Sequence, residues 1–144
     1  MKFILDTNIL VSSALFPNGV AATAYMKAIT PPYKSVVCDY TLDEFHRVFN
    51  EKFPERMTDH DLFISRMVLS VEIVHTPPEE ERDESESKIR DIKDRPILRA
   101  ALATKVDALI TGDKDFLESG IVKPRMLSVA DFLKLNDSPA HVKS

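Results

Sequence analysis

Five short apolar segments alternate along the chain with longer segments in which apolar residues recur every three or four positions. The short segments are almost continuously apolar, which is typical of parallel strands covered on both faces; they are residues 3–5, 35–38, 71–74, 108–111 and 126–129. Strands that alternate with helices favour one sheet with helices around it. We therefore expect an α/β fold, in which a central, mainly parallel five-stranded sheet is flanked by helices in a single domain.

The chain has 144 residues, which is the usual length of one domain with its own core. Residues 76–93 are the one long loop that we expect; the loop begins with two prolines and is rich in charge. A solvated acidic loop and a lid over the functional edge are both compatible with this composition. We expect the domain to span residues 1–136, this loop included, and residues 137–144 to be a flexible tail.

An acidic residue lies near each of four predicted junctions between a strand and a helix: Asp6, Glu44, Asp94 and Asp113. The carboxyl ends of parallel strands share one edge of the sheet, and ligands bind there, so these side chains should converge. Converging carboxylates repel one another unless cations lie between them, and hard divalent cations prefer oxygen ligands. The sequence therefore predicts a site for Mg²⁺ or Mn²⁺.

Helix capping is the structural alternative for each of these acids. Asp6, Asp94 and Asp113 could accept hydrogen bonds at the start of a helix, and residues 41–44 fit a capping box that ends in Glu44. Helix amino termini also stabilise anions, so one carboxylate can cap a helix and face a cation. Neighbouring acids compete for two of the positions: Asp39 and Asp43 with Glu44, and Asp91 with Asp94.

The charge of the chain is concentrated in one segment. Residues 76–94 contain eight acidic and four basic residues, which accounts for the whole net charge of −4. A negative chain is not broadly attracted to nucleic acids, but the remainder of this chain is formally neutral. Charge alone therefore does not decide the class of ligand.

The single cysteine and the absence of long apolar runs bear on the compartment. Cys38 lies within an apolar segment, which predicts a buried and unreactive thiol. The first residues resemble no export signal, and no apolar run is long enough to cross a bilayer. We expect a cytoplasmic protein with no membrane partner.

The segments around the four acids resemble the PIN-domain ribonucleases, the family of VapC-type toxins. Residues 3–11 (FILDTNILV) resemble the start of that family, and residues 109–116 (LITGDKDF) resemble its second hallmark. Residues 91–98 (DIKDRPIL) resemble its third acidic block, and residues 42–45 (LDEF) occupy the place of its early helical glutamate. The order and spacing match over nearly the whole chain. The closing segment, residues 127–133 (LSVADFL), resembles the end of a subgroup described as toxin components.

The resemblance implies a PIN-like α/β/α sandwich and a metal-dependent endoribonuclease that hydrolyses RNA phosphodiester bonds, with Mg²⁺ or Mn²⁺ as cofactor. By the same resemblance, Asp6, Glu44, Asp94 and Asp113 are the catalytic, metal-binding acids. Asn8 and Thr111 match supporting polar positions, and Asp115 matches an auxiliary acid. The implied partners are an RNA substrate, an antitoxin protein and a second copy of the chain.

Two other classes of function stay open. A PIN-like domain without activity would bind RNA or protein, and it would be expected to lack some of the acids. A receiver-type phosphoacceptor domain also binds Mg²⁺ at strand ends, but it needs adjacent acids after the first strand. Here Asp6 stands alone between Leu5 and Thr7, which disfavours the receiver interpretation.

Overall fold

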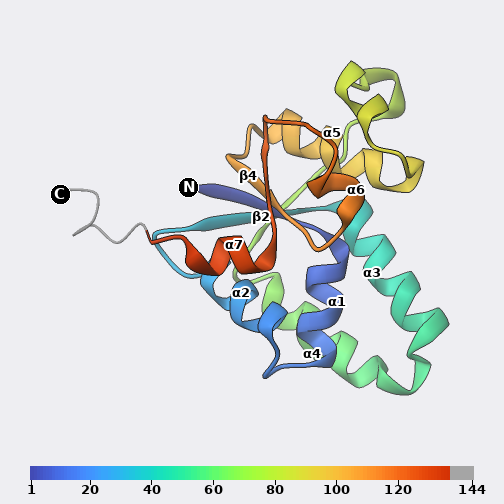
Figure 1. Cartoon of the computed structure of the whole chain (residues 1–144). Coiled ribbons are helices and arrows are strands. Elements are labelled where there is room, and N and C mark those ends of the chain that lie inside the picture. The colour runs from blue at the N-terminus through green and yellow to red at the C-terminus, as the bar shows by residue number, and fades with distance from the viewer. Residues whose placement is uncertain (137–144) are drawn as a thin grey trace.

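The computed structural model describes residues 1–136, and its centre is a five-stranded sheet with all strands parallel (Figure 1). The order of the strands is β3-β2-β1-β4-β5. The strands are β1 (Lys2–Leu5), β2 (Lys34–Cys38), β3 (Glu72–Val74), β4 (Ala108–Ile110) and β5 (Arg125–Leu127). This arrangement confirms the predicted single α/β domain with a parallel sheet.

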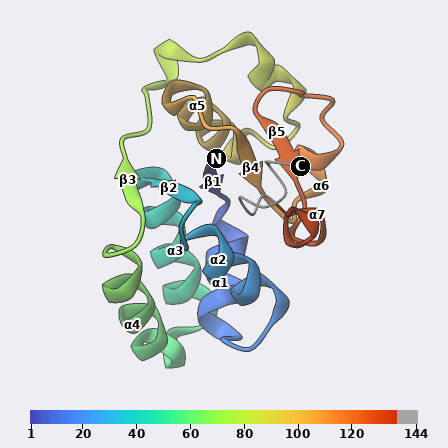
Figure 2. The same ribbon diagram turned by 90° about the vertical axis from the view of Figure 1, so that its left-hand side faces the viewer.

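Side chains of the inner strands alternate between two separate cores, which explains why these strands are continuously apolar. Phe3, Leu5 and Val37 face one core, whereas Ile4 and Val36 face the other. The helices on the first face are α1 (Thr7–Leu15), α2 (Val20–Ala28), α3 (Asp39–Lys52), α4 (Met57–Met67) and α7 (Val129–Lys134). The second face is covered by α5 (Arg95–Thr104) and α6 (Lys114–Leu117) (Figures 1 and 2). A short 3₁₀ turn, η1 (Pro54–Arg56), joins α3 to α4.

The central strand, β1, is buried on both faces. Every residue from Phe3 to Leu5 is fully buried, and the Phe3 ring packs edge-on against Phe132 of α7 with the ring centroids 5.0 Å apart. Burying an aliphatic or aromatic side chain of this size contributes roughly 1.5–3 kcal/mol. The residue that follows β1 is therefore fixed in space by packing on both faces of the sheet.

The outer parts of the sheet differ from the sequence-based expectation. Strand β3 lies at one edge, where Glu72 is exposed and Ile73 is 40% exposed, so this strand is not covered on both faces. The segment at 126–129 was expected to be a strand throughout, but the strand ends at Leu127. Ser128 then accepts a hydrogen bond from the Asp131 backbone and starts α7. A hydroxyl in that position favours a helix start over strand continuation.

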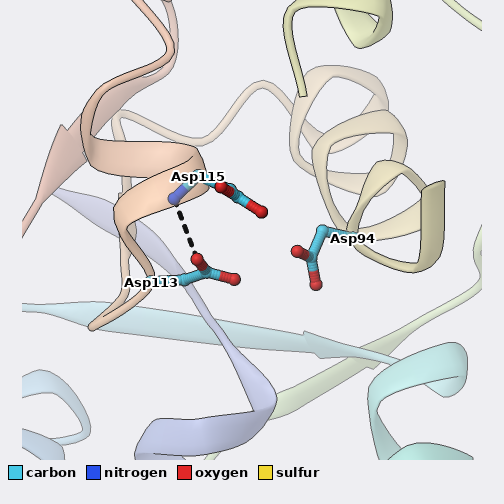
Figure 3. Close-up of side chains that lie close together, drawn as sticks. All are labelled: Asp94, Asp113 and Asp115. Carbon is cyan, nitrogen blue, oxygen red and sulfur yellow. Dashed lines mark hydrogen bonds between the residues drawn. The ribbon is translucent and has the colours of Figure 1, made fainter. Parts of the chain in front are cut away.

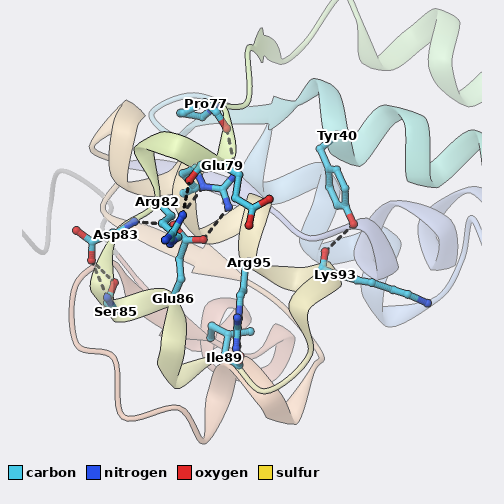
Figure 4. Close-up of polar contacts among 11 residues, drawn as sticks. Tyr40, Pro77, Glu79, Arg82, Asp83, Ser85, Glu86, Ile89, Lys93 and Arg95 are labelled. Carbon is cyan, nitrogen blue, oxygen red and sulfur yellow. Dashed lines mark hydrogen bonds and ion pairs between the residues drawn. The ribbon is translucent and has the colours of Figure 1, made fainter.

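The long connection between β3 and α5, here called the 76–94 segment, is folded against the body of the protein. It forms three short 3₁₀ turns: η2 (Glu79–Glu81), η3 (Glu84–Lys88) and η4 (Ile92–Asp94). The buried Glu86 carboxylate accepts hydrogen bonds from the Arg99 guanidinium of α5 at 2.8 and 3.2 Å, and Arg99 also donates to the Pro77 carbonyl at 3.1 Å. Figure 4 labels Pro77 and Glu86, the two acceptors of these contacts, which fix a segment that composition alone would leave in solvent.

Further expectations can be compared with the described residues. Cys38 is fully buried, as predicted, with its sulfur 3.3 Å from the Thr41 hydroxyl. Within residues 1–136, no single helix is long and apolar enough to span a membrane. Helices α1 and α2 meet the length and composition criteria only as a pair, bent by 116°. The predicted tail at 137–144 lies outside the described residues.

Candidate metal centre

Asp6 lies directly after the central strand, and both of its carboxylate oxygens are engaged. Oδ1 accepts a hydrogen bond from the Thr7 backbone at 2.7 Å, and Oδ2 accepts one from the Thr111 hydroxyl at 2.7 Å. Asp6 is only 3% exposed. The side chain thus caps α1 and is held at the carboxyl edge of the sheet, where the expected ligand site lies.

Thr111 connects Asp6 to Asp113 at the end of β4. The Thr111 hydroxyl donates to Asp6 and accepts a hydrogen bond from the Asp113 backbone at 2.9 Å. Asp113 in turn accepts a hydrogen bond from the Asp115 backbone at 2.8 Å and so caps α6. One buried hydroxyl therefore sets the spacing between acids that are 107 positions apart in the sequence.

Three aspartates approach one another closely at this edge. One carboxylate oxygen from each of Asp94, Asp113 and Asp115 lies within 4.8 Å of the other two, and Figure 3 shows the three side chains around a common space. Asp94 stands at the start of α5, but its backbone is helical and its side chain makes no capping hydrogen bond. Capping was therefore the wrong interpretation for Asp94, whereas Asp6 and Asp113 cap their helices and still line the centre.

Glu44 reaches the same region from an unexpected position in its helix. Helix α3 begins at Asp39, so Glu44 lies in its second turn, and the predicted junction and capping box at residues 41–44 are wrong. The Thr7 hydroxyl donates to Glu44, and the Arg47 guanidinium lies 3.5 Å from the Glu44 carboxylate. Thr7 donates its hydroxyl to Glu44 and its backbone N–H to Asp6, so it links the two acids.

The competing acids occupy other positions. Asp39 accepts hydrogen bonds from the Thr76 backbone and side chain and contacts His75, which ties α3 to the end of β3. Asp91 caps η4 by accepting a hydrogen bond from the Lys93 backbone, and Asp43 is exposed. These contacts give Asp39 and Asp91 structural roles and leave Glu44 and Asp94 facing the centre.

A hollow of about 510 Å³ opens beside the aspartates. Its walls include Asp6, Glu44, Asp94 and the exposed Asn8. Asp113 does not line the hollow, but it is joined to that wall through Thr111 and lies close to Asp94. The structure thus gathers the predicted acids at one edge, with Asp115 taking a place in the close group and Asp6 and Glu44 beside it.

The electrostatics of the centre show that its negative charge is poorly compensated. Burial raises the pKa of Asp6 to about 6, against the lowering effect of hydrogen bonds from Thr111 and Thr7, and the charges of Glu44 and Asp113 raise it further. Burial also raises the pKa of Asp94 to about 8, assisted by its carboxyl contact with Asp113. Nearby like charges and desolvation both disfavour ionised carboxylates. An all-oxygen donor set with this excess of charge fits a hard divalent cation.

The raised pKa of Asp6 predicts how stability depends on pH without divalent ions. Between pH 4 and 6 the folded protein keeps a proton on Asp6 that the unfolded chain has lost, so the contribution of Asp6 to stability falls as pH rises. This contribution should be about 3 kcal/mol less favourable above pH 6 than below pH 4. In urea unfolding with EDTA, the free energy of unfolding of the wild type should fall by this amount, relative to that of Asp6→Asn, as the pH rises from 4 to 6. A constant difference between the two proteins across this range would contradict the prediction.

Two contributing residues carried no signal in the sequence. The Arg90 guanidinium of the 76–94 segment lies 2.7 Å from the Asp115 carboxylate, although 25 positions separate the two residues. Thr7 holds Glu44 through its hydroxyl. Both contacts depend on tertiary placement, so periodicity and spacing could not have found them.

For metal affinity, the hydroxyl group of Thr111 should matter more than the shape of the side chain. Thr111→Val removes the donor to Asp6 and the acceptor for the Asp113 backbone, so metal affinity should fall roughly 10- to 100-fold. Thr111→Ser should retain most of the affinity. Thr104→Val is the matched control, because within residues 1–136 the Thr104 hydroxyl donates only to carbonyl oxygens of α5. If calorimetry showed that Thr111→Val and Thr111→Ser bind Mn²⁺ equally well, the Thr111 hydroxyl would not be the group that positions the acids.

The sequence and the fold match one group of known proteins. A family model described as PIN domain matches residues 2–115. Among solved structures, the VapBC2 structure from Rickettsia felis, bound to a promoter DNA fragment, matches with a TM-score of 0.67 and 21% identity, over 89% of this chain and 98% of that chain. VapBC-1 from nontypeable Haemophilus influenzae matches with a TM-score of 0.60 and 17% identity, over 90% and 99% of the two chains.

A third structural match is a Mycobacterium tuberculosis toxin. VapC20, described as a sarcin–ricin loop cleaving toxin, matches with a TM-score of 0.59 and 14% identity, over 84% of this chain and 97% of that chain. At these identities the structures establish a shared fold. No protein of curated function matches the sequence significantly.

Proposed function

Since the chain belongs to the PIN-domain family, we propose that it is a divalent-metal-dependent endoribonuclease and the toxin of a toxin–antitoxin pair. The proposed nuclease domain is residues 1–136. The observation that carries the proposal is the close approach of carboxylate oxygens from Asp94, Asp113 and Asp115 beside Asp6 and Glu44. That donor set suits Mg²⁺ or Mn²⁺.

Each residue of the centre has a proposed task. Asp6, Glu44, Asp94 and Asp113 would hold the metal, with Asp115 completing the carboxylate group. A bound divalent ion supplies Lewis-acid chemistry, which lowers the pKa of water and neutralises charge on a phosphodiester. Thr111 and Thr7 orient the acids through hydrogen bonds, and Asn8 lies at the exposed rim, where its amide can contact substrate.

Water is the proposed nucleophile. The described residues that line the hollow beside the acids include no serine, cysteine or histidine, and the Thr7 hydroxyl there is already hydrogen-bonded to Glu44, which favours water over a side-chain hydroxyl or thiol as the nucleophile. Attack by water on an RNA phosphodiester with departure of the 3′ oxygen leaves a 5′-phosphate and a 3′-hydroxyl. The proton released from water has carboxylates nearby to accept it.

The partners proposed for this chain follow from its structural neighbours. VapC20 is a toxin that cleaves the sarcin–ricin loop, which supports RNA as the substrate, and two neighbours are VapBC structures, which supports an antitoxin partner. A homodimer and a cytoplasmic location are further parts of the proposal.

The proposed activity is tested by incubating the full chain with unstructured RNA in Mn²⁺, in Mg²⁺ and in EDTA. We expect cleavage only with a divalent ion, products with 5′-phosphates, and loss of cleavage in Asp6→Asn. Asp107→Asn is the matched control, because Asp107 also accepts a backbone hydrogen bond but lies at the opposite end of the sheet. Cleavage in EDTA, or full activity in a folded Asp6→Asn protein, would overturn the proposal.

Two outcomes would favour the other functional classes. Metal and RNA binding without cleavage would indicate an inactive PIN-like binding module. An aspartate phosphorylated by acetyl phosphate, detected by mass spectrometry, would indicate a receiver-type domain.

A further inference from the structure

Six cationic side chains flank the acidic centre in two groups of the same composition. The first triplet lines the 510 Å³ hollow together with the acids Asp6, Glu44 and Asp94; it consists of Arg47, Lys52 and Lys93. The second triplet surrounds a smaller hollow of about 200 Å³ beside Asp115; it consists of Lys88, Arg90 and Lys114. Each triplet contains one arginine and two lysines, and the aspartates lie between them.

One arginine of each triplet is tied to an acid of the centre. Arg47 lies 3.5 Å from Glu44, and Arg90 lies 2.7 Å from Asp115. The arginine side chains are 53% and 87% exposed, whereas the two carboxylates are 16% and 19% exposed. The cations therefore stand at the rim, and the acids are recessed below them.

No direct ion pair neutralises the lysines of the two triplets within residues 1–136, although Glu51 also lines the first hollow and Glu118 the second. Within residues 1–136, Lys52, Lys88, Lys93 and Lys114 form no ion pair, and all four are exposed. Free surface cations attract phosphates by releasing the counterions that surround a nucleic acid. Carboxylates repel phosphates when no metal is bound, so binding should be strongest on the two sides of the centre and weak within it.

We propose that this arrangement is a track for single-stranded RNA, in which the strand crosses the acidic centre with phosphates bound by a triplet on either side. The inference rests on the proposed nuclease function and specifies how its substrate lies. Since the acids are recessed below the rim, a strand must bend to lower one phosphate to them. A flexible single strand can do so, whereas a stiff duplex stays at the level of the rim.

The 76–94 segment supplies half of the track. Lys88, Arg90 and Lys93 all belong to it, and they lie in its last third, after the acidic residues at 79–86. The Glu86–Arg99 pair fixes the middle of the segment, and the Tyr40 hydroxyl donates to the Lys93 carbonyl at 2.7 Å near its end (Figure 4). A segment that is acidic as a whole thus presents a basic wall to the centre.

The test compares three triple glutamine variants, each removing two lysines and one arginine, in an Asp6→Asn background that prevents cleavage. Two variants remove the first and the second triplet. The control removes Lys105, Lys123 and Arg125, which line a hollow of about 660 Å³ at the amino ends of β4 and β5 and form no ion pair within residues 1–136. Because the substituted side chains are exposed or on the rim, unchanged circular dichroism and Tm are expected.

Fluorescence anisotropy with a labelled unstructured RNA in Mg²⁺, repeated over a series of salt concentrations, gives the affinity and its salt dependence. Loss of either flanking triplet should weaken binding roughly tenfold at moderate salt and reduce the slope of log K against log salt by about 2, from three contacts of about 0.7 each. The control triplet should leave the slope unchanged. An unlabelled duplex of the same sequence should compete less well than the single strand.

Several results would overturn the track. Equal effects of all three triplets would indicate nonspecific attraction, and an effect of one flanking triplet alone would mean that RNA ends at the centre without crossing it. Unchanged binding in both flanking variants, or stronger competition by the duplex, would also contradict the inference. Failure of the proposed function is recognised separately: wild type that binds RNA along the track but does not cleave it with Mn²⁺ would refute the nuclease and retain the track.

Discussion

We expect Asp113→Asn to lose Mn²⁺ binding and to cleave RNA roughly a thousandfold more slowly, because a metal supplies several kcal/mol of transition-state stabilisation and each 1.4 kcal/mol is tenfold in rate. The substitution separates the two tasks of the side chain. An asparagine oxygen can still accept the hydrogen bond from the Asp115 backbone, so the cap of α6 is retained while the charge beside Asp94 is removed. Isothermal calorimetry and a cleavage assay measure the two losses.

The fold of this variant should be retained or strengthened in the absence of metal. Removing one of three close carboxylates relieves repulsion that raises the pKa of Asp94. The matched control is Asp83→Asn, because Asp83 also caps a short helical turn by accepting a backbone hydrogen bond, from Ser85, but lies outside the centre. If Asp113→Asn bound Mn²⁺ as tightly as the control, Asp113 would be a cap and nothing more.

Arg99→Met should lower the free energy of unfolding by about 3–5 kcal/mol, because it leaves the buried Glu86 carboxylate without its charged partner. The loss should extend to the 76–94 segment, which Arg99 also holds through the Pro77 carbonyl. Urea unfolding measures the stability. Limited digestion with trypsin reports the loosening, because the segment contains four lysine and arginine residues and its backbone can enter the protease once it detaches from the body of the protein.

A second substitution distinguishes an unpaired charge from lost packing. Arg99→Met combined with Glu86→Leu replaces the pair by apolar side chains and should recover a large part of the stability. Lys2→Met is the surface control: Lys2 lies 3.8 Å from an exposed Glu72, and its loss should change stability by about 1 kcal/mol or less. Equal instability of the single and double Arg99 variants would show that the charge balance at Glu86 is not the cause.

The fold could be predicted because its inner strands carry one strong physical signal. Residues such as Ile4 and Val36 are buried on the face opposite Phe3 and Leu5, so the strands read as continuous apolar segments separated by amphipathic helices. The signal is weaker at the edges of the sheet. The exposure of β3 depends on which strands have a neighbour, and neighbours cannot be read from local composition.

The convergence of the acids could be predicted because the apolar inner strands already indicated a parallel sheet. Asp6 and Asp113 follow adjacent parallel strands, and topology alone brings their carboxyl ends together. The position of Glu44 was harder, because α3 begins at Asp39 and the residue at the junction binds Thr76 instead. The pairing of Arg90 with Asp115 and of Glu86 with Arg99 required the path of the 76–94 segment, which its charged composition does not encode.

The order of the strands determines when the centre can exist during synthesis. Strand β1, which Asp6 directly follows, is made before the other four strands, but it lies in the middle of the sheet between β2 and β4. A growing chain therefore has no second neighbour for β1 until residues 108–110 have been made, and no Asp113 until shortly after that. Domains fold as units once their sequence is available. If the chain is a nuclease, a nascent or truncated copy that lacks these residues cannot cut RNA, so the cell that makes it meets the activity only after residue 113 has been added.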